Sequence, residues 1–139
     1  MWALSKPSPR TRWCDRDAKI RTFERIAEAV VQRVQLLDEV REGVRFWTRR
    51  YRTGACFNSR FYDLEFRTND REELVKAVLA GTQIDARSQL LAAMIIVYRL
   101  RNNLFHGLKT ISMLNEQVPN LDMACRTLAA IVKASGRLP

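Results

Sequence analysis

The stretch LLAAMIIVYRLRNNLFHG, residues 90–107, carries most of the information about the fold. It opens with Leu90–Tyr98, which is apolar throughout. Around this run apolar residues recur at the helical period, at Ile84, Leu91, Met94, Tyr98 and Phe105. Thr82 is placed to cap the start of a helix, and Gly107 to stop it. The stretch therefore predicts a long, core-facing helix that ends at His106.

The half of the chain before this stretch also shows helical periodicity. Between Asp15 and Gly54, apolar residues recur at steps of three and four, at Ile20, Phe23, Ala27, Val30, Val34, Leu37, Val44, Trp47 and Tyr51. We expect a single helix here, on the order of 50 Å long at a rise of about 1.5 Å per residue. Asp15 or Asp17 would cap its start and Gly54 would stop it, with Gly43 as a candidate kink.

Two shorter helices are expected between this helix and the apolar stretch. Asn58 can cap a short helix that buries Phe61. Asn69, followed three residues later by Glu72, resembles a capping box that opens a helix ending at Gly81.

The last predicted helix begins after Pro119, which divides it from residues 108–119, where no pattern is clear. Its predicted core face ends near Gly136 and comprises Leu121, Ala124, Cys125, Leu128, Ile131 and Val132. The chain shows no strand-like alternation of useful length and no Gly-rich phosphate loop. The predicted fold class is therefore all-α, an antiparallel four- to five-helix bundle over residues 15–139. Residues 1–14, rich in proline, serine and basic residues, are expected to form a flexible basic arm.

Composition narrows the kinds of partner. The 139 residues include 24 Lys and Arg against 15 Asp and Glu, a net charge of +9, which favours polyanions such as RNA. A basic surface that serves only solubility is the alternative. Cys14, Cys56 and Cys125 lie far apart without metal-ligand spacing, which indicates reduced thiols in a cytoplasmic protein. The chain shows no pattern of a signal peptide or a membrane-spanning helix, so we expect a soluble protein without membrane, metal or cofactor.

The end of the predicted motif helix carries the candidate chemistry. His106 is the only histidine in the chain, and histidine is the side chain best suited to proton transfer near neutral pH. Arg101 supplies a fixed cation for a phosphate, and Asn102, one turn before His106, is expected to orient its imidazole. Five residues turn about 500° on a regular helix, so Arg101 and His106 point roughly 140° apart. Two chains related by a two-fold axis could place two copies of Arg101 and two copies of His106 in one cleft.

The string Arg101–Gly107 resembles the R-x4-6-H motif of the HEPN superfamily (higher eukaryotes and prokaryotes nucleotide-binding domains). Arg101 matches the motif arginine, Asn102 the polar residue that follows it, and His106 the motif histidine. The resemblance implies a helical bundle and, as in many members, a metal-independent ribonuclease with its active site at a homodimer interface. Many such proteins are toxins or phage-defence effectors, which implies an antitoxin or defence partner. A sub-pattern with a tyrosine two residues after the histidine is not matched, because Leu108 stands there.

We therefore expect an endoribonuclease that cleaves RNA by attack of the 2′-hydroxyl, with Arg101, Asn102 and His106 as catalytic residues. A cationic ridge is predicted to follow RNA phosphates, formed by Arg41, Arg45, Arg49 and Arg52 at steps of four, four and three. Lys109, just after the motif, completes the predicted RNA-binding set. The alternative is that these arginines form an ordinary solvated surface, whose charge is partly neutralised by neighbouring acidic residues. For the whole chain, the alternative is a non-catalytic helical module that binds RNA, a nucleotide or a protein partner.

Overall fold

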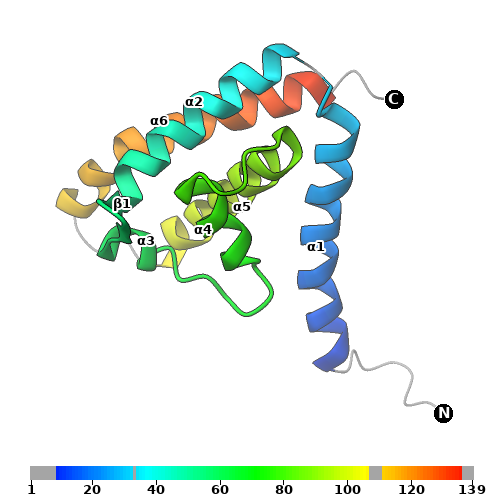
Figure 1. Cartoon of the computed structure of the whole chain (residues 1–139). Coiled ribbons are helices and arrows are strands. Elements are labelled where there is room, and N and C mark those ends of the chain that lie inside the picture. Colours follow the sequence, from blue (N-terminus) through cyan, green and yellow to red (C-terminus); the bar gives the residue numbers. More distant parts are fainter. Residues whose placement is uncertain (1–8, 33, 107–110, 136–139) are drawn as a thin grey trace.

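The computed structural model describes residues 9–32, 34–106 and 111–135, with side chains described over 19–32, 38–103 and 115–134 (Figure 1). In chain order the elements are α1 (Pro9–Val30), α2 (Val34–Tyr51), β1 (Arg52–Thr53), β2 (Cys56–Phe57), α3 (Ser59–Tyr62), α4 (Glu72–Ala80), α5 (Ala86–His106) and α6 (Ile111–Ser135). The predicted all-α class is confirmed, since the only strands in the described residues are the two short ones. These pair antiparallel in a hairpin that directly follows α2.

Helix α5 is the predicted motif helix, and it lies at the centre of the fold. It contacts α1, α2, α4 and α6, and Leu90–Ile96 are all buried as a result. Asp85 caps it, because its carboxylate accepts the backbone N–H of Ser88 at 3.0 Å. This hydrogen bond lowers the pKa of Asp85. The prediction that Thr82 caps this helix was wrong, because the hydroxyl of Thr82 donates to the carbonyl oxygen of Ala77 at 3.1 Å.

The single helix expected between Asp15 and Gly54 is in fact two helices. Helix α1 ends at Val30 and α2 begins at Val34, and Figure 1 shows them meeting at a steep angle. Helix α1 packs against α5 and α6, whereas α2 packs against α4, α5 and α6. One straight helix of that length could not follow both surfaces of a small domain. The steep angle of α1 also means that the helices do not form a simple antiparallel bundle.

Helix α1 begins earlier than the sequence predicts. It starts at Pro9 rather than near Asp15, so residues 9–14 of the predicted flexible arm are helical. Proline suits the first helical position, because the missing N–H would have no helical partner there. Residues 1–8 of the predicted arm lie outside the described residues.

Helices α2 and α6 lie side by side along one edge of the molecule (Figure 1). Pro119 does not start a new helix as predicted, since α6 runs through it from Ile111 to Ser135. Proline removes one helical hydrogen bond. In the turn before it, Arg50 of α2 donates a guanidinium hydrogen bond to the carbonyl oxygen of Glu116 at 3.0 Å. Packing against α2 thus supports a helix that its own sequence would interrupt.

A buried polar cluster fixes the register between α2 and α6. Trp47 donates its indole N–H to Oδ1 of Asn120 at 2.7 Å, and Nδ2 of Asn120 donates to the hydroxyl oxygen of Tyr51 at 3.0 Å. All three side chains are buried, and burial raises the pKa of the Tyr51 hydroxyl. A shift between the helices would leave these groups without partners, at a cost of about 1–3 kcal/mol each.

The ends of the shorter helices follow the predictions only in part. Asn58 caps α3 as predicted, its side chain accepting the N–H of Phe61 at 3.2 Å. Gly81 ends α4 as predicted, at a φ of 85°. The predicted capping box at Asn69 is wrong, because the residue that precedes α4 is Arg71, in a left-handed conformation and without a side-chain cap. Gly54 lies in the hairpin turn after α2, at a φ of 64°.

Gly43 permits a close approach of α2 to α6. A Cβ at this position would lie 2.8 Å from Oγ1 of Thr127 and 3.1 Å from the ring of Trp47. We expect Gly43→Ala to lower the free energy of unfolding by about 1–3 kcal/mol, because overpacking exceeds the gain in helix propensity. Urea denaturation measures this loss. The double variant Gly43→Ala/Thr127→Ala lacks the nearest atom and should recover part of it, whereas an undiminished stability of Gly43→Ala would contradict the close approach.

Candidate functional site

Arg101 and Asn102 lie near the end of α5, one turn beyond a contact with α1. In that contact the ring of Tyr98 packs edge-on against Phe23, with ring centroids 5.8 Å apart, and Nζ of Lys19 lies 5.2 Å from the Tyr98 ring centroid. Arg101 is exposed and donates a guanidinium hydrogen bond to Oδ1 of Asn102 at 3.3 Å. This end of α5 therefore presents cationic groups from two helices to the solvent.

His106 is the last residue of α5, as the sequence predicts. Its side chain lies outside the described residues, so its predicted contact with Asn102 stays a prediction. The helix is continuous from Arg101 to His106, which places the two positions roughly 140° apart around its axis. Two such positions on one helix cannot meet at one phosphate. The geometry of a single chain thus leaves the predicted catalytic pair incomplete.

A second arginine of α5, missed by the sequence interpretation, anchors the motif end of the helix. Arg99 is 3% exposed; its Nε donates to the carbonyl oxygen of Leu64 at 3.0 Å, and its guanidinium pairs with Asp70 at 3.4 Å. One turn later, Asn103 donates from Nδ2 to the carbonyl oxygen of Asp63 at 2.9 Å. Position 106 is seven residues after Arg99 and so falls on nearly the same side of the helix. The motif end of α5 is therefore bound to the segment that follows α3.

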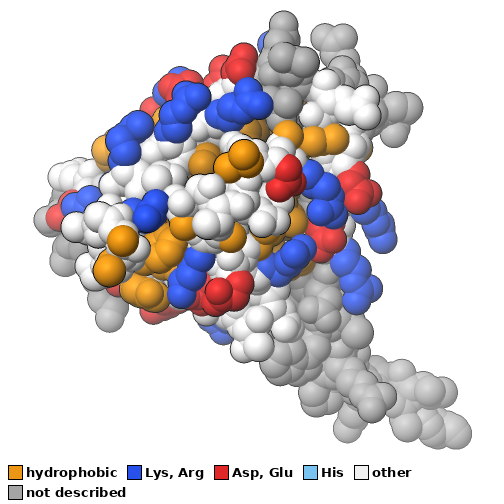
Figure 2. Space-filling model, in the orientation of Figure 1, with side chains coloured by type: hydrophobic (Ala, Val, Ile, Leu, Met, Phe, Trp, Pro, Cys, Tyr) orange, Lys and Arg blue, Asp and Glu red, His pale blue; other side chains and the backbone are white. Residues whose placement is uncertain are grey.

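Three of the four arginines of the predicted cationic ridge lie exposed along α2. Arg41, Arg45 and Arg49 are exposed on α2, and Figure 2 shows basic side chains in a row over this helix. Arg41 pairs with Asp38 at 3.7 Å. Within the described residues, the side chains of Arg45 and Arg49 form no hydrogen bond or ion pair. These two arginines are thus available to an anionic ligand.

Arg52 does not belong to the ridge, contrary to the prediction. It lies beyond the end of α2, in β1, where the chain has left the helical period that would align it with Arg49. Its guanidinium donates to the carbonyl oxygen of Leu79 at 3.3 Å and lies 5.9 Å from the ring of Phe57. Lys109, the remaining member of the predicted RNA-binding set, lies outside the described residues.

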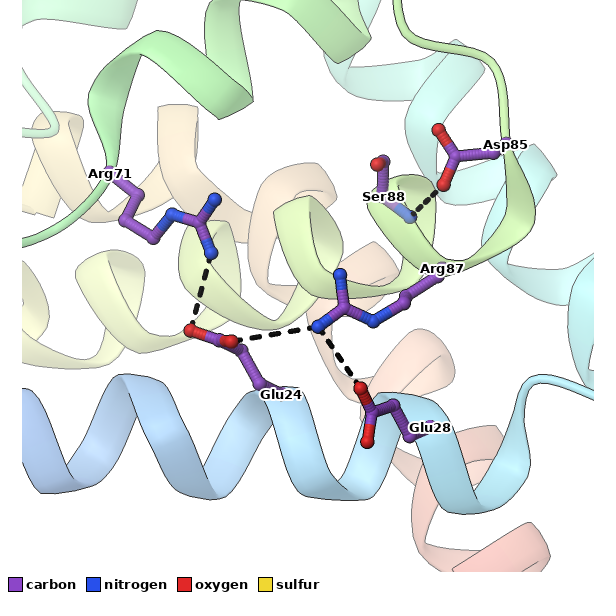
Figure 3. Close-up of polar contacts among 6 residues, drawn as sticks. All are labelled: Glu24, Glu28, Arg71, Asp85, Arg87 and Ser88. Carbon is purple, nitrogen blue, oxygen red and sulfur yellow. Dashed lines mark hydrogen bonds and ion pairs between the residues drawn. The ribbon is translucent and has the colours of Figure 1, made fainter.

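Other cations are paired with carboxylates at the partly exposed surface between helices. Figure 3 shows Glu24 of α1 between two arginines: it pairs with Arg71 at 3.2 Å and with Arg87 at 3.5 Å. Arg87 also pairs with Glu28 at 3.3 Å. This network ties α1 to the start of α4 and of α5. Because their charges are already matched, Arg71 and Arg87 are poor candidates for RNA contacts, unlike Arg45 and Arg49.

Comparison of the chain with models of protein families, with curated proteins and with solved structures yielded no match. In the described part of the chain, no three His, Cys, Asp or Glu residues are grouped as metal ligands would be. None of the helices, over the same residues, is long and apolar enough to cross a membrane.

Proposed function

We propose that the protein is a metal-independent endoribonuclease of the HEPN type, in which two copies of the chain share one active site. His106 acts as the general acid or base, Arg101 stabilises the phosphate, and Asn102 orients His106. The observation that carries this proposal is the placement of Arg101 and position 106 on different sides of one regular helix. In a dimer, the second chain supplies a histidine to act with Arg101 and an arginine to act with His106.

The chemistry follows from two histidines in one cleft. One imidazole, as base, removes the proton of the 2′-hydroxyl, and the 2′-oxygen attacks the adjacent phosphorus. The other, as acid, protonates the departing 5′-oxygen. Arg101 stabilises the negative charge that develops on the phosphate oxygens. The products carry a 2′,3′-cyclic phosphate and a 5′-hydroxyl.

The hydrogen bond between Arg101 and Asn102 supports a joint role for these two residues. It holds the guanidinium beside an amide whose Nδ2 can still donate to a phosphate oxygen or to an imidazole. The buried contacts of Arg99 with Leu64 and Asp70 hold this end of α5 in place. A fixed helix end is what a preorganised cationic site requires.

Product analysis tests this proposal. Incubation of the protein with single-stranded RNA should yield 2′,3′-cyclic phosphate ends, and EDTA should leave the rate unchanged, because side chains alone supply the acid, the base and the cation. The cellular role proposed with it, a toxin or defence effector in the cytoplasm, implies a partner protein that restrains the cleavage. RNA that stays intact at every protein concentration would contradict the enzymatic proposal.

A non-catalytic module that binds RNA is the second candidate. It is favoured by Arg45 and Arg49, whose cationic surface needs no histidine to bind a phosphate backbone. This candidate predicts RNA binding without cleavage. Both candidates share the ridge, so a test of the ridge bears on each.

We expect Arg45→Glu/Arg49→Glu to weaken binding of single-stranded RNA and to flatten its dependence on salt. Each lost phosphate contact should reduce the slope of log K against log salt by about 0.7. Titration of a labelled RNA at several salt concentrations measures this slope. The control variant Arg25→Glu/Lys133→Glu changes the net charge equally, at exposed positions of α1 and α6. Equal slopes for the two variants would contradict a role for the ridge.

A further inference from the structure

Helix α6 carries apolar residues on two faces, and only one of these faces lies in the core. The buried face combines the apolar Met123, Ala124 and Ile131 with the polar Asn120 and Thr127. The second face, called here the α6 stripe, consists of Val118, Leu121, Cys125, Leu128 and Val132. Val118 is 54% exposed, Leu128 45% and Val132 55%; Cys125 is also exposed and Leu121 is half-buried. The prediction that Leu121, Cys125, Leu128 and Val132 belong to the core face was therefore wrong.

The spacing of the α6 stripe is that of a helix–helix contact. Its members follow one another at steps of three, four, three and four, which is the heptad pattern of a coiled-coil seam. Three of the five exposed large hydrophobic residues among the described side chains lie on it. Single exposed apolar residues are common on protein surfaces, but a contiguous stripe at this period is typical of an interaction surface.

The order of residues in the stripe suits a contact with a second copy of the same chain. Read in either direction, the stripe is Val, Leu, Cys, Leu, Val. If two copies pack antiparallel about an axis at Cys125, Val118 faces the second copy's Val132, and Leu121 packs beside its Leu128, one residue or about 1.5 Å out of exact register. A two-fold contact requires such a self-complementary surface. Asp122 then lies opposite the second copy's Leu128 and next to its Ala129, so no like charges meet beside the seam.

We propose that the α6 stripe binds the same stripe of a second copy of this chain, antiparallel, across a two-fold axis at Cys125. Cys125 is fourteen residues from Ile111, about 21 Å along α6. The axis thus passes through the middle of α6 and not through the end of α5 that carries Arg101. This contact is separate from the shared site proposed above and does not rest on it.

The size of the stripe sets the expected strength of the contact. Val118 and Val132 are about 21 Å apart along the helix, and packed helices are spaced by about 8–10 Å. Such a seam buries less than the roughly 800 Å² per partner of a standard interface. The association is therefore expected to be weak and reversible.

Disulfide cross-linking tests the contact at its axis. In a Cys14→Ser/Cys56→Ser variant only Cys125 remains, and diamide should join two chains through it at protein concentrations of tens of micromolar. The matched control is Cys14→Ser/Cys125→Ser, which keeps Cys56, an exposed cysteine outside the stripe. Addition of Leu128→Glu to the Cys125-only variant should abolish the cross-link, because it places charges in the seam, while circular dichroism confirms the fold. Light scattering of Leu128→Glu should show a lower mean mass than wild type.

The outcomes separate this inference from the proposed function. Cross-linking through Cys125 in a protein that cleaves no RNA would leave the α6 contact standing and remove only the nuclease proposal. Equal cross-linking through Cys125 and Cys56, or a mass unchanged by Leu128→Glu, would overturn the α6 contact whatever the cleavage assay shows.

Discussion

Replacement of His106 by alanine is expected to lower the rate of RNA cleavage about 10²- to 10⁴-fold, the usual contribution of general acid–base catalysis. His106 is the only histidine of the chain, so no other imidazole can take over the proton transfer. The affinity for RNA should change little, because Arg45, Arg49 and Arg101 remain. Single-turnover cleavage of a labelled RNA measures the rate, and binding to a non-cleavable 2′-deoxy analogue measures the affinity.

Asn103→Ala is the matched control for this variant. It lies in the same turn of α5 and removes a hydrogen bond to the carbonyl oxygen of Asp63, at an expected cost of about 1 kcal/mol of stability. It should therefore lower the melting temperature without a comparable loss of rate. Cleavage at the wild-type rate by a folded His106→Ala variant would rule out this site as the catalytic one. A melting temperature lowered by His106→Ala with no loss of rate would assign the residue a structural role at the helix end.

Replacement of Arg99 by alanine is expected to lower the free energy of unfolding by about 3–5 kcal/mol. The side chains of Arg99 and Asp70 are 4% and 7% exposed, so loss of the guanidinium leaves a buried carboxylate without its counter-charge. The carbonyl oxygen of Leu64 also loses its donor. Guanidinium chloride denaturation monitored by circular dichroism measures the change.

Two comparisons identify the cause of this loss. In Arg99→Met/Asp70→Leu both charges are replaced by apolar groups, and the loss should be much smaller than in Arg99→Ala, as in other buried pairs. The exposed pair of Arg126 and Glu42, each 49% exposed and 3.3 Å apart, is the second comparison. Arg126→Ala should change the stability by at most about 1 kcal/mol, because water screens this pair. Equal losses in Arg99→Ala and Arg126→Ala would contradict the burial of the Arg99 pair.

The helices were largely predictable because each has an apolar face. The apolar run at Leu90 indicates a central helix, and this helix does end at His106. Asn58 and Gly81 mark helix ends through local chemistry, namely a side-chain cap and a left-handed backbone. Such signals lie within a few residues and need no knowledge of the rest of the chain.

The features that were mispredicted depend on contacts between distant segments. Val30 and Val34 preserve the helical spacing across the break between α1 and α2, so only the packing of each helix reveals it. The continuity of α6 through Pro119 is supported by α2, including the hydrogen bond from Arg50. Apolar residues lie on both faces of α6, and the sequence alone could not separate the buried face from the exposed one.

The candidate site was predicted only in part, because some of its contacts also join distant segments of the chain. Arg101, Asn102 and the arginines of α2 could be identified from their spacing, and the structure places them at the surface or partly exposed. The binding of Arg52 to Leu79 could not be read from its spacing, because β1 changes the direction of the chain after Tyr51. Arg99 was overlooked, although a charged residue directly after a long apolar run is itself a signal of a buried ion pair.

The shared active site is tested by mixing wild-type protein with a ninefold excess of the His106→Ala variant after equilibration of the subunits. If one cleft requires His106 from both chains, the active dimers fall with the square of the wild-type fraction. Cleavage per wild-type chain should then drop to about a tenth of its value without the variant. Cleavage per wild-type chain that is unchanged by the excess of variant would show that each chain acts alone, and would contradict the shared site.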